Sequence, residues 1–259
     1  MATSVARAGA VLVVFGLSNL AGAEEKEAHS RGDVDWGRQV IRATGAGAPD
    51  VRATNPAQAR LGAEQAAKLD ALRNLLAQVK GIHLSGEKTV GTEMATDEVR
   101  AKVEGTVRGF KVVDKRYFSD SGLEIDVEVP LAGVAALFEP VPEKPFPLNG
   151  TSKATGLVLD ARGLKVTPAL GMRVLDAAGG ALYSQDALAP KARETRAAAS
   201  YFHSLDEAKK SGRVGEKPVV IKVVRVDGTD LVLSADDSKK LADANAGALH
   251  EGQVAVIFN

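Results

Sequence analysis

The sequence has 259 residues, of which 45% are hydrophobic and 25% are charged, enough to bury a sizeable core. Lysine plus arginine and aspartate plus glutamate number 33 each, which argues against binding to nucleic acid or an anionic membrane through net charge. Aromatic residues make up only 4% of the chain, which disfavours binding by stacking against bases or sugars.

The first 23 residues have the pattern of a secretory signal peptide. Arg7 precedes an apolar run (AGAVLVVFGL), and the sequence Ala21-Gly22-Ala23 is a small-residue cleavage signature. The run is about ten residues long, whereas a membrane-spanning helix needs about 20. We therefore predict cleavage after Ala23 and a periplasmic location.

The chain contains no cysteine, so an exported form cannot use disulfides or carry the acylated cysteine of a bacterial lipoprotein. Since no second apolar run follows, we expect no membrane-spanning segment in the mature chain. Residues 24–32 are charged and lack apolar periodicity, which predicts a flexible leader with His29 solvated rather than bound to a metal.

Residues 33–139 are predicted to form a small sheet packed by a long and a short helix, in the order β-α-α-β-β. A strand over residues 38–44 is followed by Gly-Ala-Gly-Ala-Pro at residues 45–49. Two glycines between a strand and a helix can form a phosphate-binding loop, but the third glycine of the dinucleotide pattern and a lysine-serine or lysine-threonine pair are missing. We favour a turn that needs the conformational freedom of glycine.

The best-marked element is a helix from Asn55 to Gly81. Asn55 is a favourable N-cap, followed by Pro56 at the first helical position and Gln58 at the capping-box position. Five apolar residues share one face, which we expect to pack on the sheet: Leu61, Leu69, Leu72, Leu76 and Val79. Alanines between them allow a close approach. The opposite face is predicted to be free for a protein partner and carries Arg60, Glu64, Lys68 and Arg73.

A connector, a second helix and a hairpin follow. Residues 82–90 are expected to be a short extended segment with His83 facing solvent, and Thr96 to cap a helix reaching Arg108. Its apolar stripe consists of Val99, Val103 and Val107. The hairpin pairs residues 110–118 with residues 123–129, whose apolar positions alternate with acidic ones.

The acidic positions of the second hairpin strand are Glu124, Asp126 and Glu128. A cation site is one interpretation, but neighbours on one strand face are about 7 Å apart, too far for one ion without further ligands. We favour a solvated sheet face paired with Lys111 and Lys115.

Residues 140–150 are rich in proline and predict a stiff linker, after which residues 151–259 are expected to form a second α/β domain with a mixed sheet. Its predicted strands are residues 156–160, 172–175, 181–183, 218–226, 231–233 and 253–258. Ser204 and Ser234 are expected to cap helices. The nearly continuous apolar run at residues 218–226 predicts a buried central strand.

The first domain resembles the FlgP/FlgT-type flagellar envelope lipoprotein family over residues 33–135. The likeness lies in residues 41–45 (IRATG), the helix pattern of residues 59–76, residues 103–109 (VEGTVRG) and residues 129–131 (VPL). The resemblance implies a small α/β domain acting in envelope assemblies and, in some members, in flagellar rings. This chain departs from the family because it lacks the acylated cysteine.

The sequence assigns no catalytic, cofactor-binding or metal-binding residue. His203 with Asp206 and Glu207 has metal-ligand spacing, but carboxylates at a helix start more often compensate the helix dipole. Asp160, Arg162 and Asp176 could line a pocket, although an ion pair made by Arg162 between strands is the simpler interpretation.

Two functional hypotheses follow. The first is an exported, non-enzymatic envelope protein that serves as a structural or assembly module, with protein partners or further copies of itself. The alternative is a periplasmic protein that binds a small ligand through the domain formed by residues 151–259. An enzyme is disfavoured because no nucleophile stands beside a base in a known motif.

Overall fold

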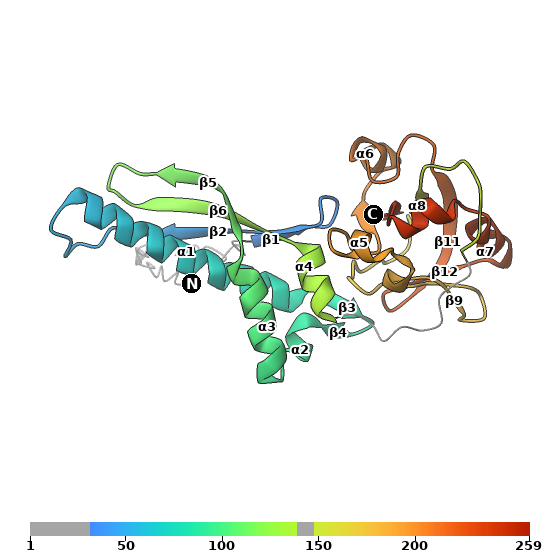
Figure 1. The fold of residues 1–259 in the computed structure, drawn as a ribbon, viewed down its shortest axis with the longest axis horizontal. Helices are drawn as coiled ribbons and strands as arrows, with labels where there is room; N and C mark the ends of the chain where they lie inside the picture. The colour runs from blue at the N-terminus through green and yellow to red at the C-terminus, as the bar shows by residue number, and fades with distance from the viewer. Residues whose placement is uncertain (1–31, 139–147) are drawn as a thin grey trace, which may run out of the picture.

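The computed structural model describes residues 32–138 and 148–259, which form an α+β fold with two main sheets (Figure 1). We refer to these two ranges as the N-terminal and C-terminal domains. The predicted signal peptide, nearly all of the predicted leader and most of the predicted linker lie outside the described residues. Within the described residues, no helix is long and apolar enough to cross a membrane.

The N-terminal domain is a four-stranded antiparallel sheet with strand order β1-β2-β6-β5, accompanied by helices and a small hairpin. Its elements are β1 (Gly32–Asp35), β2 (Val40–Gly47), α1 (Pro56–Gly81), β3 (His83–Ser85), β4 (Lys88–Thr89), α2 (Val90–Glu93), α3 (Asp97–Arg108), β5 (Lys111–Tyr117), β6 (Leu123–Pro130), α4 (Leu131–Ala135) and η1 (Ala136–Phe138). The predicted long helix, second helix and hairpin are confirmed. Strand β1 was missed, so the sheet begins one strand earlier than predicted.

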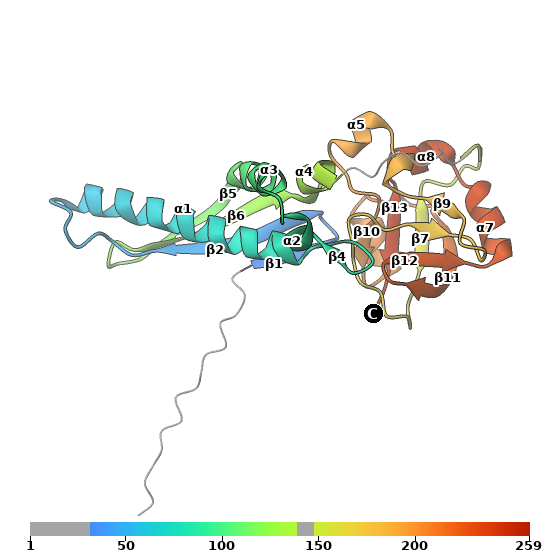
Figure 2. The same ribbon diagram turned by 90° about the horizontal axis from the view of Figure 1, so that it is seen from below.

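Helix α1 begins and ends as the capping residues predict. The side chain of Asn55 accepts a hydrogen bond from the backbone N–H of Gln58 at 2.9 Å. The side chain of Gln58 does not complete a capping box with Asn55; its oxygen accepts from the backbone N–H and the hydroxyl of Thr54. Figure 2 shows α1 running along the sheet.

The face of α1 that packs on the sheet differs from the prediction. The buried stripe consists of Ala63, Ala67, Ala71, Leu75 and Val79, spaced four residues apart. Leu61 and Leu69 are 59% and 64% exposed, so the predicted leucine stripe is wrong at these two positions. Alanine fits the buried positions of α1 because the strand beneath it, β2, is glycine-rich and the two backbones lie close together.

Gly45 and Gly47 lie inside β2 and face α1, so the predicted turn at residues 45–49 is wrong. A Cβ added to Gly45 would lie 2.2 Å from the carbonyl oxygen of Ala67, and one added to Gly47 would lie 1.9 Å from that of Ala63. Both positions lack room for any side chain. The two glycines therefore serve close helix–sheet packing and not phosphate binding.

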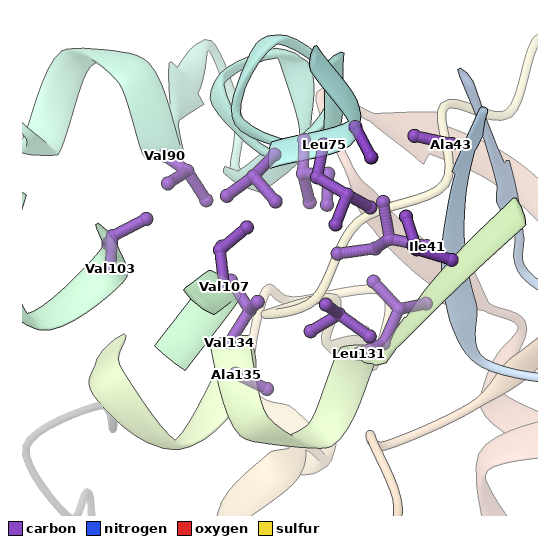
Figure 3. Close-up of a cluster of buried hydrophobic side chains, with 14 of the residues drawn as sticks. Ile41, Ala43, Leu75, Val90, Val103, Val107, Leu131, Val134 and Ala135 are labelled. Carbon is purple, nitrogen blue, oxygen red and sulfur yellow. The ribbon is translucent and has the colours of Figure 1, made fainter. Parts of the chain in front are cut away.

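The core of the N-terminal domain lies between α1, the sheet and the shorter helices. Figure 3 shows side chains from β2, α1, α3 and α4 converging, among them Ile41, Leu75, Val107 and Leu131. The predicted alternation of β6 is confirmed, since its apolar residues are buried and its acidic residues are partly exposed.

The C-terminal domain contains a seven-stranded mixed sheet with strand order β10-β13-β7-β11-β12-β8-β9. Its elements are β7 (Leu157–Asp160), β8 (Val174–Leu175), β9 (Ala181–Tyr183), η2 (Gln185–Ala187), α5 (Pro190–Arg193), β10 (Ser200–Phe202), α6 (Leu205–Lys210), β11 (Val219–Asp227), β12 (Asp230–Leu233), α7 (Ala235–Ala242), α8 (Ala246–His250) and β13 (Val254–Ile257). Ser204 and Ser234 cap α6 and α7 as predicted. Strand β10 and helices α5 and α8 were missed.

Strand β11 is central in the sheet, as predicted, but it is not buried on both faces. Ile221 and Val223 are buried, whereas Val220 and Val224, which flank them on either side in the sequence, are about half exposed. A parallel pairing with β7 on one side and an antiparallel pairing with β12 on the other make the sheet mixed. An apolar run therefore does not distinguish a strand covered on two faces from one covered on a single face.

The two domains meet at a contact formed by Trp36, Gln39, Tyr201 and Arg213. The rings of Trp36 and Tyr201 pack edge to face with centroids 5.4 Å apart. Gln39 has φ of 57° and is buried; its side-chain oxygen accepts from Nη1 of Arg213 at 3.2 Å. Elsewhere along the boundary the backbone N–H of Leu170 donates to the carbonyl of His83 at 3.0 Å.

His83 is therefore not the solvent-facing residue that was predicted. Strand β3 forms a parallel bridge from His83 to Ala169 of the C-terminal domain. The Nδ1 atom of His83 is buried and has no hydrogen-bond partner among the described residues. The hairpin β3–β4 thus belongs to the contact between the domains.

Candidate functional site

The face of the N-terminal sheet opposite α1 carries charged and polar side chains around a shallow depression. It carries the outward side chains of β2 and β6, which are partly exposed. A shallow open depression of about 500 Å³ lies on it. The lining residues include Asp33, Arg42, Thr44, Val113, Asp126 and Glu128.

The three acidic residues of β6 are held by arginines. Glu128 accepts from Nε of Arg42 at 2.9 Å and pairs with Arg38 at 3.4 Å. Asp126 pairs with Arg116 and also accepts from the hydroxyl of Thr44 at 2.7 Å. The hydrogen bond from Arg116 is the largest cause that holds the pKa of Asp126 below its usual value.

The predicted pairing of this acidic face with Lys111 and Lys115 is wrong at Lys115. A bulge between Val112 and Asp114 adds one residue to β5, so the side chains after it change faces. Arg116 consequently joins the acidic face. Lys115 lies on the helix side and donates to Glu64 of α1 at 2.9 Å.

The polar depression can offer hydrogen bonds and charges of both signs, but its Arg116–Asp126 pair is poorly suited to acid–base catalysis. The hydrogen bond with Asp126 raises the pKa of Arg116, and the partner carboxylate is held ionised. A general acid or base works best with a pKa near the working pH. Nor do the described residues contain a group of three or more histidine, aspartate or glutamate side chains that could hold a metal ion.

Glu64 forms an ion-pair cluster that ties α1 to β5. Its carboxylate lies 2.9 Å from Nζ of Lys115 and 2.8 Å from Nζ of Lys68. The hydrogen bonds from Lys115 and then Lys68 lower the pKa of Glu64 from 4.5 to about 2. Glu64 therefore combines a clearly lowered pKa with an ion pair that joins two elements of this domain, α1 and β5.

Replacing Lys115 with methionine should reduce the free energy of unfolding at pH 7. A carboxyl group with a lowered pKa stabilises the fold above its unfolded pKa, and this contribution is lost as the pH falls through the folded pKa. The loss of unfolding free energy in the variant should therefore shrink as the pH falls from about 4.5, the ordinary pKa of Glu64, to about 2, its lowered pKa in the fold. Urea unfolding of the wild type and the variant across this range measures it, with Lys111→Met as control. A deficit that is equal at all pH values contradicts the expectation.

The predicted metal-ligand candidates lie at the start of α6 and serve its local structure. The side chain of Ser204 accepts from the backbone N–H of Glu207, and Glu207 accepts from the backbone N–H of His203 at 3.1 Å. The ring of His203 packs on Phe258 with centroids 4.8 Å apart. These side chains act in helix capping and packing.

Asp160, Arg162 and Asp176 are not brought into one pocket by the contacts they make. Arg162 pairs with Asp160 at 2.6 Å, two residues earlier, and this bond lowers the pKa of Asp160. The ion pair is therefore local and does not join two strands as predicted. Asp176 accepts from the backbone N–H groups of Ala178 and Gly180 and shapes the β8–β9 turn.

Exposed large apolar side chains were not predicted and gather in the N-terminal domain. Those found in the described residues are Val51, Leu61, Leu69, Val113, Tyr117, Phe118, Val220 and Val224. Only the last two belong to the C-terminal domain. The spacing of Ala63, Ala67 and Ala71 opposite two glycines is the sequence signal that could have assigned Leu61 and Leu69 to the solvent face.

Four of these residues lie toward one end of the N-terminal domain, which we call the distal end: Val51, Leu61, Tyr117 and Phe118. Tyr117 pairs with Leu123, and Leu123 pairs with Gly47, the last residue of β2. Figure 1 shows that the β2–α1 loop and the β5–β6 turn both lie at the end away from the C-terminal domain. Tyr117 and Phe118 are 60% and 50% exposed.

A family model described as the second domain of Treponema pallidum Tp0624 matches residues 156–259, almost the whole C-terminal domain. No curated protein matches the chain.

Proposed function

We propose that this chain is an exported, non-enzymatic protein of the bacterial cell envelope that acts as a structural or assembly module. The observation that carries the proposal is the distal end, where exposed aromatic and aliphatic side chains gather at one end of the molecule. The signal-peptide pattern of residues 1–23 supports export. The resemblance of residues 33–135 to the FlgP/FlgT-type family supports a role in an envelope assembly, flagellar or otherwise.

The composition of the distal end suits a protein interface. Leaving apolar surface in water is unfavourable by roughly 25 cal/mol per Å², and an exposed cluster of such residues commonly marks an interaction site. Tyrosine and phenylalanine are enriched in interfaces, whereas single exposed leucines are common everywhere. Because this end lies away from the domain contact, it is free to meet a partner while both domains stay together.

The ion pairs of the open sheet face support a non-enzymatic role. Arg116 pairs with Asp126, and Arg42 pairs with Glu128, on this face. Such pairs stabilise a surface and set its specificity more readily than they transfer protons.

The alternative, a periplasmic ligand-binding protein, has one observation in its favour. The side-chain oxygens of Gln185 and Ser200 are buried and lack a hydrogen-bond partner among the described residues. Buried polar atoms usually have a partner, which water or a small ligand could supply. Both residues belong to the domain that this hypothesis assigns to ligand binding.

Photo-crosslinking in cells tests the assembly proposal. A photoreactive amino acid in place of Phe118 should give discrete high-mass adducts in the envelope fraction, whereas the same residue in place of Val224, an equally exposed position on the C-terminal domain, should give few. The adducts from position 118 should decrease when Tyr117 is replaced with serine. Equal labelling at both positions, or recovery of the chain in the cytoplasm with Met1 intact, overturns the proposal.

A further inference from the structure

The outer edge of β10 is covered by the turn between β1 and β2, residues 36–39. Strand β10 is the last strand on one side of the seven-stranded sheet and pairs with β13 on its inner side. Figure 1 shows the β1–β2 turn reaching from the N-terminal sheet to the C-terminal domain, and Figure 2 shows β10 on the side of that domain that faces the N-terminal domain. The turn therefore occupies the position at which a further strand would add to the sheet.

Three hydrogen bonds join the turn to alternate residues of this edge. The carbonyl oxygen of Trp36 accepts from the backbone N–H of Tyr201 at 3.3 Å. The side chain of Gln39 donates to the carbonyl of Ala199 at 2.9 Å and accepts from the backbone N–H of Ala197 at 3.2 Å. The backbone groups of alternate residues face the same neighbour in a ladder of strands. Gln39 therefore makes, with its side chain, two of the bonds that an added strand would make with its backbone.

A positive charge without a carboxylate partner lies beside this edge. Arg213 is 8% exposed, and its Nη1 donates to the same oxygen of Gln39 at 3.2 Å. Burial and, to a lesser extent, the charge of Arg196 lower the pKa of the Arg213 guanidinium. Both arginines donate to carbonyl or carboxamide oxygens, and neither is paired with a carboxylate in the two described ranges. Because an uncompensated buried charge is unfavourable, this position favours an anionic group.

We propose that the outer edge of β10 and Arg213 together bind an extended peptide with a carboxylate side chain, and that the β1–β2 turn occludes this site in the chain by itself. The peptide backbone pairs with β10 as an added strand, and the carboxylate takes the place of the Gln39 oxygen. A carboxylate there accepts the same two hydrogen bonds, from Ala197 and Arg213, and adds the attraction of opposite charges. The site lies in the domain contact, away from the distal end, and does not depend on the proposed assembly function.

The bonds of the turn suit an occluding segment that a peptide can displace. Gln39 has φ of 57°, a left-handed conformation that is unfavourable for residues other than glycine. Among the described residues, the turn gives this edge one backbone hydrogen bond, from Tyr201 to Trp36, whereas an added strand pairs through its backbone along its length. Since the site is open only when the turn has withdrawn, the apparent affinity of the wild type is reduced to the open fraction of molecules.

Peptide binding to two opened variants tests the site. Gln39→Gly removes the occluding side chain, and Gln39→Asn shortens it by one methylene; both residues tolerate positive φ. Fluorescence anisotropy with the full chain measures binding of a short labelled peptide of alternating valine and threonine with one central glutamate. Both variants should bind this peptide about tenfold or more tighter than the wild type. Ser121→Gly, also at positive φ but in the β5–β6 turn, should bind it as the wild type does.

Variant peptides and the fluorescence of Trp36 identify what the site recognises. Glutamine in place of the central glutamate should weaken binding to Gln39→Gly about tenfold, and proline beside the glutamate should abolish it, because proline lacks the N–H of a strand residue. Trp36 emission should shift to longer wavelength on binding, as its ring leaves Tyr201. The wild type should show the same shift at higher peptide concentration.

The contrary results are equally specific. Equal binding by the wild type and both opened variants shows that the turn does not occlude the site, and equal binding of the glutamate and glutamine peptides removes the role of Arg213. Either result overturns the proposal, as does the absence of both peptide binding by the variants and a Trp36 shift in the wild type. A blocked glutamate that binds as tightly as the peptide overturns the strand pairing. Crosslinking from Phe118 concerns another surface, so the assembly function is judged separately.

Discussion

Replacing Gly47 with alanine should destabilise the N-terminal domain by about 3 kcal/mol or more, the upper range for an overpacked site. The added methyl group would lie 1.9 Å from the carbonyl oxygen of Ala63, a backbone atom that cannot swing aside. Helix α1 must therefore move off the sheet. Urea unfolding followed by circular dichroism measures the loss, and Gly45→Ala should behave in the same way.

Gly105→Ala is the matched control. Gly105 lies in the interior of α3, and a Cβ added there would meet nothing within 4 Å. Alanine is favoured over glycine in a helix by about 1 kcal/mol, so this variant should be more stable than the wild type. If Gly47→Ala were as stable as Gly105→Ala, the close packing of α1 on β2 would be contradicted.

The bounds of α1 were predictable from sequence, but the face it buries was not. Asn55 and Pro56 are local signals that act within one turn, and local signals can be read from one segment. The choice between the leucine stripe and the alanine stripe depends on β2, where Gly45 and Gly47 remove the side chains that would hold α1 away. That choice is set by tertiary packing, and it leaves Leu61 and Leu69 exposed.

The open sheet face illustrates a second limit. Alternation correctly placed Glu124, Asp126 and Glu128 on one face, since the side-chain period of a strand is two. It assigned the wrong partner at Lys115 because a one-residue bulge in β5 reverses the alternation and has no clear sequence signature. The sequence constrains the functional hypotheses even less. Tyr117 and Phe118 resemble ordinary strand residues in the sequence, and their exposure is recognised only when β5 is known to be an edge strand.

The contact between the domains was beyond prediction because its residues are far apart in the chain. Arg213 is buried and donates to the carbonyl oxygens of Val254 and Ala197 and to the side chain of Gln39. Burial lowers the pKa of this guanidinium, and no carboxylate hydrogen-bonds it among the described residues. The charged guanidinium of Arg213 therefore donates to neutral acceptors only, and the loss of any one of them should destabilise the fold.

Replacing Gln39 with glycine should destabilise the domain contact by about 3 kcal/mol. The side chain serves three groups, accepting from the backbone N–H of Ala197 and from Arg213 and donating to the carbonyl of Ala199. Leaving a buried polar group unpaired costs about 1–3 kcal/mol. Glycine is chosen because φ is 57° at this position, so the loss reports the side chain and not backbone strain.

Trp36, the sole tryptophan, lies in this contact and provides the measurement. In the wild type, its fluorescence and the circular dichroism signal should change together during urea unfolding. In Gln39→Gly the fluorescence should change at lower urea, because the domains separate before either unfolds. Ser121→Gly, also at positive φ (70°), should keep the two signals together. Coincident, unshifted transitions in Gln39→Gly would show that Gln39 does not hold the domains together.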